Sequence, residues 1–257
     1  MRTYLPWIYL ALAFGFIYLP VCVLVLFSFQ DGGLPVPPFD GPSLKWYREV
    51  LSDRDVTDAL IHSLFVAVGS SAVAVILGFL AAYGLARHTL PGSAFIRLLL
   101  VAPLTVSYLI VGLGLLIVLS RAGFGLSLGT AGIGHVVINL PLAFAIIYAS
   151  MGAQHENAER AARDLGASEM RVVVLVTAPM LAPAIAAAFF LSVTLSWDEF
   201  IIAFLLTRFD ITLPVEIWSM LRSGLSPRLN AIGSVVFLIS VAAVLILEFT
   251  TLRRRRS

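Results

Sequence analysis

Charged residues are scarce in this chain of 257 residues, where Asp, Glu, Lys and Arg together make up 12%. Soluble domains carry about 25% charged residues, so this composition cannot cover an ordinary water-facing surface. Hydrophobic residues reach 60%, and the mean hydropathy is +0.97. The shortage of charge therefore predicts an integral membrane protein and argues against a soluble catalytic domain.

Several chemical motifs are missing as well. The only cysteine, Cys22, cannot form an intrachain disulfide, so it carries no information on the redox compartment. The phosphate-binding pattern G-x-x-x-x-G-K-[ST] does not occur, and His62, His88 and His155 lack the spacing of metal ligands. A net charge of +2 gives no reason to expect a nucleic-acid partner. We therefore expect no catalytic residue, cofactor or metal in this chain.

Six apolar runs are long enough to cross a bilayer, whose hydrocarbon core of about 30 Å needs about 20 residues of helix. They are Trp7–Phe29, Ser63–Ala86, Leu98–Ser120, Thr130–Met151, Met180–Thr207 and Ala231–Leu252. Barrel strands of about 10 residues do not explain runs of this length, and the apolar part of a signal peptide is shorter, typically about 7–15 residues. The sequence predicts an all-α integral membrane protein with six transmembrane helices in one domain, residues 1–257.

Basic residues predict how such a protein is oriented, because cytoplasmic loops carry an excess of Lys and Arg. The run Arg253–Arg256 directly follows the last span, where it matches a stop-transfer signal that contacts anionic lipid. With six spans, both termini are then expected in the cytoplasm. The two largest outside segments, residues 30–62 and 208–230, are expected to contain short helices at Leu44–Leu51 and Pro214–Leu221.

A polar insert at residues 158–183, between the fourth and fifth spans, is the most informative segment. Its apolar residues recur at helical spacing and predict one stripe: Ala158, Ala161, Ala162 and Leu165. Its charged residues occupy the other faces: Glu159, Arg160, Arg163 and Asp164. Gly166 follows at a position where a helix end favours positive φ. The pattern predicts a short helix that either docks in a partner groove or lies on the membrane surface.

The insert resembles a family at these residues. RAARDLGAS, with Pro179 thirteen residues after Gly166, is similar to the EAA signature of permease subunits of bacterial ABC importers. Ala161, Ala162, Gly166 and Pro179 match it at the expected spacing. Val176 stands for the usual isoleucine. Arg160 occupies the place of the usual glutamate, and Ala178 that of the usual leucine. The departure at Arg160 puts in doubt any salt bridge that the family makes through its glutamate.

Further segments extend the resemblance over most of the chain. FLSVTLSWDEFIIAFLLT, LPVEIWSMLRSGLSPRLNAIGSVV and SLKWYREVL are similar to the second permease subunit of spermidine/putrescine importers. The resemblance implies the type I importer fold in the bacterial inner membrane, with polyamines or related small organic cations as the solute. It also implies four kinds of partner: a second, different permease subunit, two ATPase subunits that bind ATP and Mg, an external binding protein, and lipid.

In that family the EAA helix is the coupling helix that docks in a cleft of the ATPase. The resemblance therefore implies a coupling segment at about residues 156–168. Its expected ATPase-coupling residues are Ala158, Glu159, Arg160, Ala161, Ala162, Asp164, Leu165 and Gly166.

Trp197, Asp198 and Glu199 form a second polar feature, in the outer part of the fifth span. Ionisable groups inside a membrane are costly, and they usually face a water-filled cavity or a partner group. An organic cation is attracted by carboxylates and by an aromatic face, so we expect these residues, Asp198 above all, to border a translocation path. The alternatives are an ion pair of Asp198 with Arg208 or Arg222, or exposure at the membrane interface.

His135 and Asn139 lie four residues apart in the fourth span, where they either line a pore or bind a neighbouring helix, the commoner use of such residues. Two other functions stay open beside polyamine import. One is the same machine with another solute, such as an opine, an amino-acid derivative, a phosphonate or ferric iron. The other is a different class: a secondary transporter, or a membrane enzyme that uses Asp198 and Glu199 as acid and base.

Overall fold

The computed structural model describes residues 5–254, with side chains for residues 6–242. All regular elements in this range are helices, as the composition predicts. They are α1 (Leu5–Ser28), α2 (Lys45–Ser52), α3 (Arg54–Arg87), α4 (Ser93–Val101), η1 (Ala102–Thr105), α5 (Tyr108–Arg121), α6 (Leu128–Ser150), α7 (Ala153–Asp164), α8 (Glu169–Val172), η2 (Val173–Thr177), α9 (Ala178–Met180), α10 (Ala182–Trp197), α11 (Ile201–Leu206), α12 (Leu213–Ser223) and α13 (Pro227–Arg254). The short helices expected in the two largest outside segments are present as α2 and α12.

Three helices are straight, long and apolar enough to cross a membrane: Pro6–Ser28, Arg54–Arg87 and Leu128–Ser150. Two further candidate spans are bent pairs, so the described residues contain up to five spans by length and composition. The sixth predicted span falls in α13, whose side chains are described only as far as residue 242, and the side chains of the basic run Arg253–Arg256 lie outside the described residues. An all-helical membrane fold is thus evident, and the count of six remains a prediction.

Two predicted spans are not single straight helices. In place of a continuous helix at 98–120, α4 with η1 meets α5 at an angle of 108°. Pro103 lacks a backbone N–H, and Val106 adopts an extended conformation, so the helix ends before Tyr108 begins the next one. The predicted span 180–207 begins at a bend of 73° between the helical segments Glu169–Met180 and Ala182–Trp197. Its helix α10 ends at Trp197, before α11 starts at Ile201.

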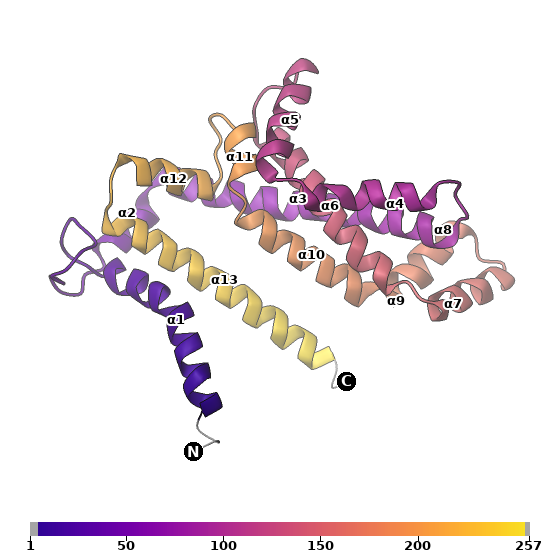
Figure 1. The fold of residues 1–257 in the computed structure, drawn as a ribbon, viewed down its shortest axis with the longest axis horizontal. Helices are drawn as coiled ribbons and strands as arrows, with labels where there is room; N and C mark the ends of the chain where they lie inside the picture. Colours follow the sequence, from indigo (N-terminus) through magenta and orange to yellow (C-terminus); the bar gives the residue numbers. More distant parts are fainter. Residues whose placement is uncertain (1–4, 255–257) are drawn as a thin grey trace. The chain divides into compact units, whose positions relative to one another are not determined.

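The chain packs as two compact units. Unit 2, residues 59–215, is organised around α6, against which α4, α10 and α11 pack (Figure 1). Its larger apolar core joins α3, α6 and α10 through Phe79, Phe144 and Ala188, which are buried. A second cluster joins α6 to α11 through Ile138, Ile202 and Leu206. Unit 2 therefore holds both polar features that the sequence singles out.

Unit 1 comprises residues 1–58 and 216–257. Within it, α13 packs against α1 and α2. The indole nitrogen of Trp46 on α2 donates to the carbonyl of Gln30 at 2.7 Å, which ties the short helix to the chain that leaves α1. The apolar window of α1 has no residue buried inside the protein, as expected of a helix whose apolar side chains meet lipid.

Close packing of α3 on α6 depends on Gly78. A Cβ at Gly78 would lie 2.8 Å from the backbone nitrogen of Phe144, whereas a Cβ at Gly69 on the same helix would meet nothing within 4 Å. Gly78→Ala is expected to lower the midpoint of thermal unfolding of the detergent-solubilised protein, because the added methyl group must push two helices apart at a cost of about 1–3 kcal/mol. Gly69→Ala is the matched control and should not lower it, since alanine favours a helix. Equal midpoints for the two variants would contradict this packing.

Candidate functional site

The polar insert forms α7, and both of its ends are sharply defined. Gly152 precedes the helix in an extended conformation, and the helix begins at Ala153, before the predicted segment. At the other end Gly166 has φ +85°, as predicted from its place after the apolar stripe. The N–H groups of Gly166 and Ala167 donate to the carbonyls of Arg163 and Ala162 at 2.9 and 3.0 Å, the pattern of a Schellman cap. The chain thus turns abruptly on both sides of α7.

The side chains of α7 are distributed differently from the predicted stripe. Ala161 is exposed and Leu165, at the helix end, is 89% exposed, but Ala158 and Ala162 are half-buried against the body of the protein. Glu159, expected on a polar face, is fully buried. The outward face consists of Asn157, Arg160, Ala161, Asp164 and Leu165. Helical periodicity alone could not place Glu159, because its burial depends on a charged partner distant in the sequence.

That partner is Arg87, the last residue of α3. Its Nε and Nη2 donate to the two carboxylate oxygens of Glu159 at 2.7 and 3.2 Å, and the Arg87 side chain is itself buried. The hydroxyl of Thr177 donates to the same carboxylate at 3.0 Å. Thr177 ends η2, a π-helical turn, a feature often found at functional sites. Glu159 therefore connects three segments: α7, the end of α3 and the start of the chain toward α10.

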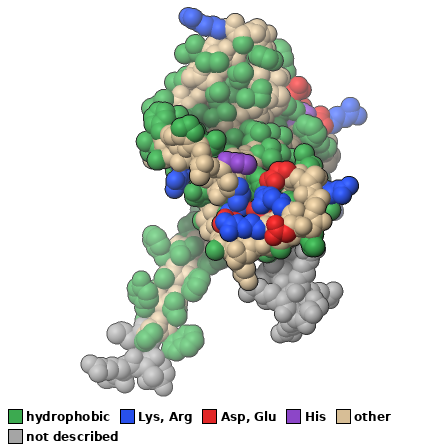
Figure 2. Space-filling view, turned by 90° about the vertical axis from the view of Figure 1, so that its right-hand side faces the viewer, with side chains coloured by type: hydrophobic (Ala, Val, Ile, Leu, Met, Phe, Trp, Pro, Cys, Tyr) green, Lys and Arg blue, Asp and Glu red, His purple; other side chains and the backbone are tan. Residues whose placement is uncertain are grey.

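A second charged group lies one helical turn along α7. Arg163 donates from Nε and Nη2 to the carboxylate of Glu169 on α8, both at 2.9 Å, and from Nη2 to the hydroxyl of Tyr83 on α3 at 3.1 Å. Tyr83 in turn donates to Glu169. Figure 2 faces the side on which Figure 1 draws α7 and α8, and charged side chains of both signs lie close together there. On the outward face, Arg160 pairs with Glu156 of the same helix.

The second polar feature of the sequence coincides with a break in the helix. Trp197 ends α10, and Asp198 is exposed at its C-terminus. Glu199 is buried, and its carboxylate accepts the backbone N–H groups of Ile201, Ile202 and Ala203 at 2.9, 2.8 and 3.2 Å. These donors have no partner inside the new helix. Glu199 thus caps α11, and the two neighbouring carboxylates have separate roles.

Asp198 makes no ion pair among the described residues of unit 2, so the expected alternative of a pair with Arg208 does not occur there. Arg208 instead lies over the ring of Phe209, at 5.1 Å from the ring centre. Irregular backbone at membrane depth is tolerated where it is buried in protein or lines a water-filled cavity. The exposed carboxylate at this break is therefore available to a ligand or to a partner.

His135 and Asn139 are both buried. Nδ1 of His135 is hydrogen-bonded to the hydroxyl of Ser196 on α10, which also lies 3.3 Å from the hydroxyl of Ser70 on α3. Nε2 of His135 is 3.6 Å from the carboxylate of Glu199. His135 therefore holds neighbouring helices together, the second of the two roles that the sequence left open.

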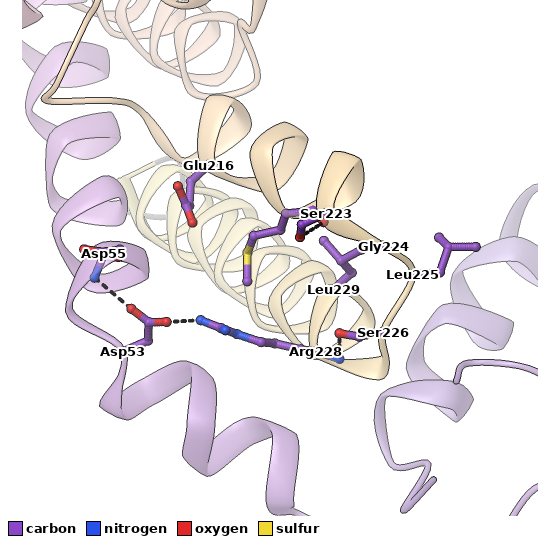
Figure 3. Close-up of a pocket in the computed structure, with 10 residues that line it drawn as sticks. Asp53, Asp55, Glu216, Ser223, Gly224, Leu225, Ser226, Arg228 and Leu229 are labelled. Atoms are coloured by element: carbon purple, nitrogen blue, oxygen red, sulfur yellow. Dashed lines mark hydrogen bonds and ion pairs between the residues drawn. The ribbon is translucent and has the colours of Figure 1, made fainter. Parts of the chain in front are cut away.

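Unit 1 contains a cavity of about 350 Å³ that the sequence does not indicate (Figure 3). Asp53, Asp55 and Glu216 line it together with Arg228, and Arg228 pairs with Asp53 and lies 3.5 Å from Glu49. Burial raises the pKa of the Glu216 carboxyl, and the negative charge of Asp55 adds to the rise in pKa. Among the residues with described side chains, no group of three or more His, Cys, Asp or Glu residues is arranged to hold a metal ion.

Comparison with known proteins supports the resemblance over most of the chain. The family described as "Binding-protein-dependent transport system inner membrane component" matches residues 74–255. The spermidine/putrescine transport system permease protein PotC of Escherichia coli (strain K12) is 28% identical over 234 residues, which cover 90% of this chain and 88% of that protein. The putrescine transport system permease protein PotI of the same strain is 34% identical over 241 residues, which cover 90% of this chain and 85% of the relative.

A solved structure shares the fold. It belongs to a bacterial ABC transporter involved in the import of the acidic polysaccharide alginate, and it aligns with a TM-score of 0.68 over 95% of this chain and 93% of the other. At 16% sequence identity, this similarity concerns the fold alone.

Glu199→Ala is expected to lower the thermal unfolding midpoint of the solubilised protein, because three backbone donors lose their acceptor. The loss of a helix cap costs about 0.5–2 kcal/mol. Asp198→Asn, one residue away and exposed, is the control and should leave the midpoint unchanged. Differential scanning fluorimetry in detergent measures both, and a larger fall for Asp198→Asn than for Glu199→Ala would contradict the assignment of the cap.

Proposed function

Because the chain belongs to the family of binding-protein-dependent transport system inner membrane components, we propose that it is the transmembrane permease subunit of an ATP-driven importer for polyamines or related small organic cations. The observation that carries this proposal is the similarity to spermidine/putrescine and putrescine permeases over 90% of the chain. Members of this family are transport subunits rather than enzymes, and a separate subunit hydrolyses ATP. The proposed complex contains a second, different permease, two ATPase subunits that bind ATP and Mg, and an external binding protein.

The outward face of α7 is proposed to dock on the ATPase, at the cytoplasmic side, with both termini on that side as well. Ala161 and Leu165 supply an exposed apolar contact at the end of a short helix, and the small side chain of Ala161 allows a partner to approach the backbone closely. Arg160, Asp164 and Gly166 lie beside them at the same end of the helix. The inward residues Ala158, Glu159 and Ala162 are proposed to support α7 rather than to touch the ATPase.

The break after α10 is proposed to border the translocation path. Asp198 is exposed and has no ion pair among the described residues of unit 2, and Trp197 precedes it in the sequence. A carboxylate and an aromatic ring favour a cationic solute, which supports polyamines over an acidic solute. Glu199 caps α11, so it contributes to the path by shaping the break. The same machine with another solute is the remaining alternative, and nothing in the site favours a secondary transporter.

Ala161→Trp is expected to abolish docking of the ATPase, because the large ring would separate α7 from its partner. The measurement is the amount of ATPase that co-purifies with the permease pair, together with putrescine uptake by liposomes that contain the complete complex. Ala94→Trp, at an exposed alanine of α4, is the matched control and should retain both. Normal co-purification and uptake with Ala161→Trp would exclude α7 as the docking element.

Asp198→Asn is expected to reduce the uptake of putrescine and spermidine while leaving assembly with the ATPase intact, because it removes one negative charge without changing size. Asp210→Asn, at an exposed carboxylate in the loop after α11, serves as the control for nonspecific charge effects. The measurement is the initial rate of putrescine and spermidine uptake into proteoliposomes that contain the complete complex with each variant or with the parent. If Asp198→Asn and the parent have equal rates at limiting solute concentration, Asp198 does not border the path.

A further inference from the structure

The chain connections at the two ends of α7 are not continuous helix. Gly152 joins α6 to α7 in an extended conformation, and Gly166 reverses the chain after the helix with φ +85°. A short helix attached only through two such joints would pivot about them. Motion received by α7 would then be dissipated in the joints instead of reaching the transmembrane helices, so any rigid connection must come from side chains.

Two pairs of side chains supply that connection. Tyr83 and Arg87 are four residues apart on α3, and Glu159 and Arg163 are four residues apart on α7, so each pair lies on one face of its helix. Arg87 meets Glu159 at 2.7 Å, and Arg163 meets the hydroxyl of Tyr83 at 3.1 Å. The two contacts form two rungs between the same two helices, one turn apart. A single contact would allow rotation about it, whereas two contacts fix both the position and the direction of α7.

Burial and additional bonds make these rungs stiff. The Glu159 side chain is 0% exposed and that of Arg87 is 8% exposed, so water does not compete for the first rung, and two parallel N–H···O bonds also fix its geometry. Glu169 bonds to both partners of the second rung, and Arg163 Nη2 lies 3.9 Å from Glu159, which links the rungs to each other. Thr177 extends the first rung to η2.

We propose that this α3–α7 ladder, consisting of Tyr83, Arg87, Glu159, Arg163 and Glu169, is the positioning device through which α7 moves α3 as one rigid lever. The proposal rests on the function proposed above, because it assumes that α7 receives the motion of the ATPase. It assigns to Glu159 a role different from that of a docking residue: Glu159 faces its own protein and transmits the force. The long helix α3 carries the displacement along its 34 residues, while the joints at Gly152 and Gly166 relieve the strain on the backbone.

The test separates transmission from folding by replacing the first rung as a pair. Removing one member of a buried ion pair strands the other charge and is strongly destabilising, but replacing both members with apolar residues of similar size is often neutral. The variant is therefore Arg87→Met with Glu159→Leu, studied in the complete complex with the second permease, both ATPase subunits and the external binding protein in liposomes. The readouts are ATPase retained on purification, ATP hydrolysed, and putrescine and spermidine taken up per ATP.

The paired variant is expected to retain the ATPase and to hydrolyse ATP, but to take up at least about fivefold less solute per ATP, the lower end of coupling between distant sites. The reversed pair, Arg87→Glu with Glu159→Arg, should take up more solute per ATP than the apolar pair, because it restores an ion pair. Tyr83→Phe, which removes only the hydroxyl of the second rung, should also lower the amount of solute taken up per ATP. Thr105→Val, at a hydroxyl that donates to the carbonyl of Ala102 one turn earlier in the same short helix, is the control and should not lower the amount of solute taken up per ATP.

If the variant with the apolar pair takes up as much solute per ATP as the parent, the ladder is overturned and the proposed function stays intact. If the variant with the apolar pair does not assemble with the ATPase, the Tyr83→Phe variant provides the test instead. An unchanged amount of solute taken up per ATP in Tyr83→Phe would equally overturn the ladder. A parent complex that takes up neither putrescine nor spermidine, or an Ala161→Trp variant that couples normally, would refute the proposed function, and the ladder with it.

Discussion

The structure depends on one constraint: within lipid, every backbone polar group must find its hydrogen-bond partner inside the protein. Straight apolar helices satisfy it with their own hydrogen bonds, apart from the one that Pro141 removes within α6. Where the chain leaves the helix, a side chain takes over. Glu199 accepts the first N–H groups of α11, and Arg87 neutralises the carboxylate that α7 turns inward. In unit 2, Arg87 lies at the end of α3, and Asp198 and Glu199 lie at the break between α10 and α11.

The same constraint explains how the helices of unit 2 recognise one another. Lipid is as apolar as a leucine-rich surface, so polar contacts and close packing must hold the helices together. His135 and Ser196 join α6 to α10, and Ser196 lies beside Ser70 of α3. Farther along α3, the absence of a side chain at Gly78 lets α3 approach the backbone of α6. These contacts hold α3 rigidly, and a helix must be rigid if it is to carry a displacement from one side of the membrane to the other.

The sequence predicts the features that are local. Composition and run length predict helices, and the spacing before Gly166 predicts the end of α7, since both depend on neighbouring residues. The bend between η1 and α5 and the break after Trp197 involve nearby residues, Pro103 and Glu199, but composition and run length do not reveal them. The burial of Glu159 is not local. Glu159 contacts Arg87, which lies 72 residues earlier in the chain. The helical spacing of apolar residues in the insert does not predict this contact. A charged residue directly after an apolar span, such as Arg87, was the one available signal, and it indicated only the membrane boundary. The residues that line the cavity of unit 1 come from two segments distant in the sequence. Neither segment alone therefore predicts the cavity.

The departure of this chain from the family signature becomes intelligible in these terms. Arg160 occupies the position of the usual glutamate, and it lies on the outward face of α7, paired with Glu156 one turn earlier. The acidic residue next to it, Glu159, lies about 100° away around the helix and points inward to Arg87. The substitution therefore alters only the charge that α7 presents to its surroundings, and it leaves the attachment of α7 to α3 untouched. Arg160 and Glu159, adjacent in the chain, thus belong to different faces of α7: Arg160 lies on the outward face, and Glu159 on the face that holds α7 against α3.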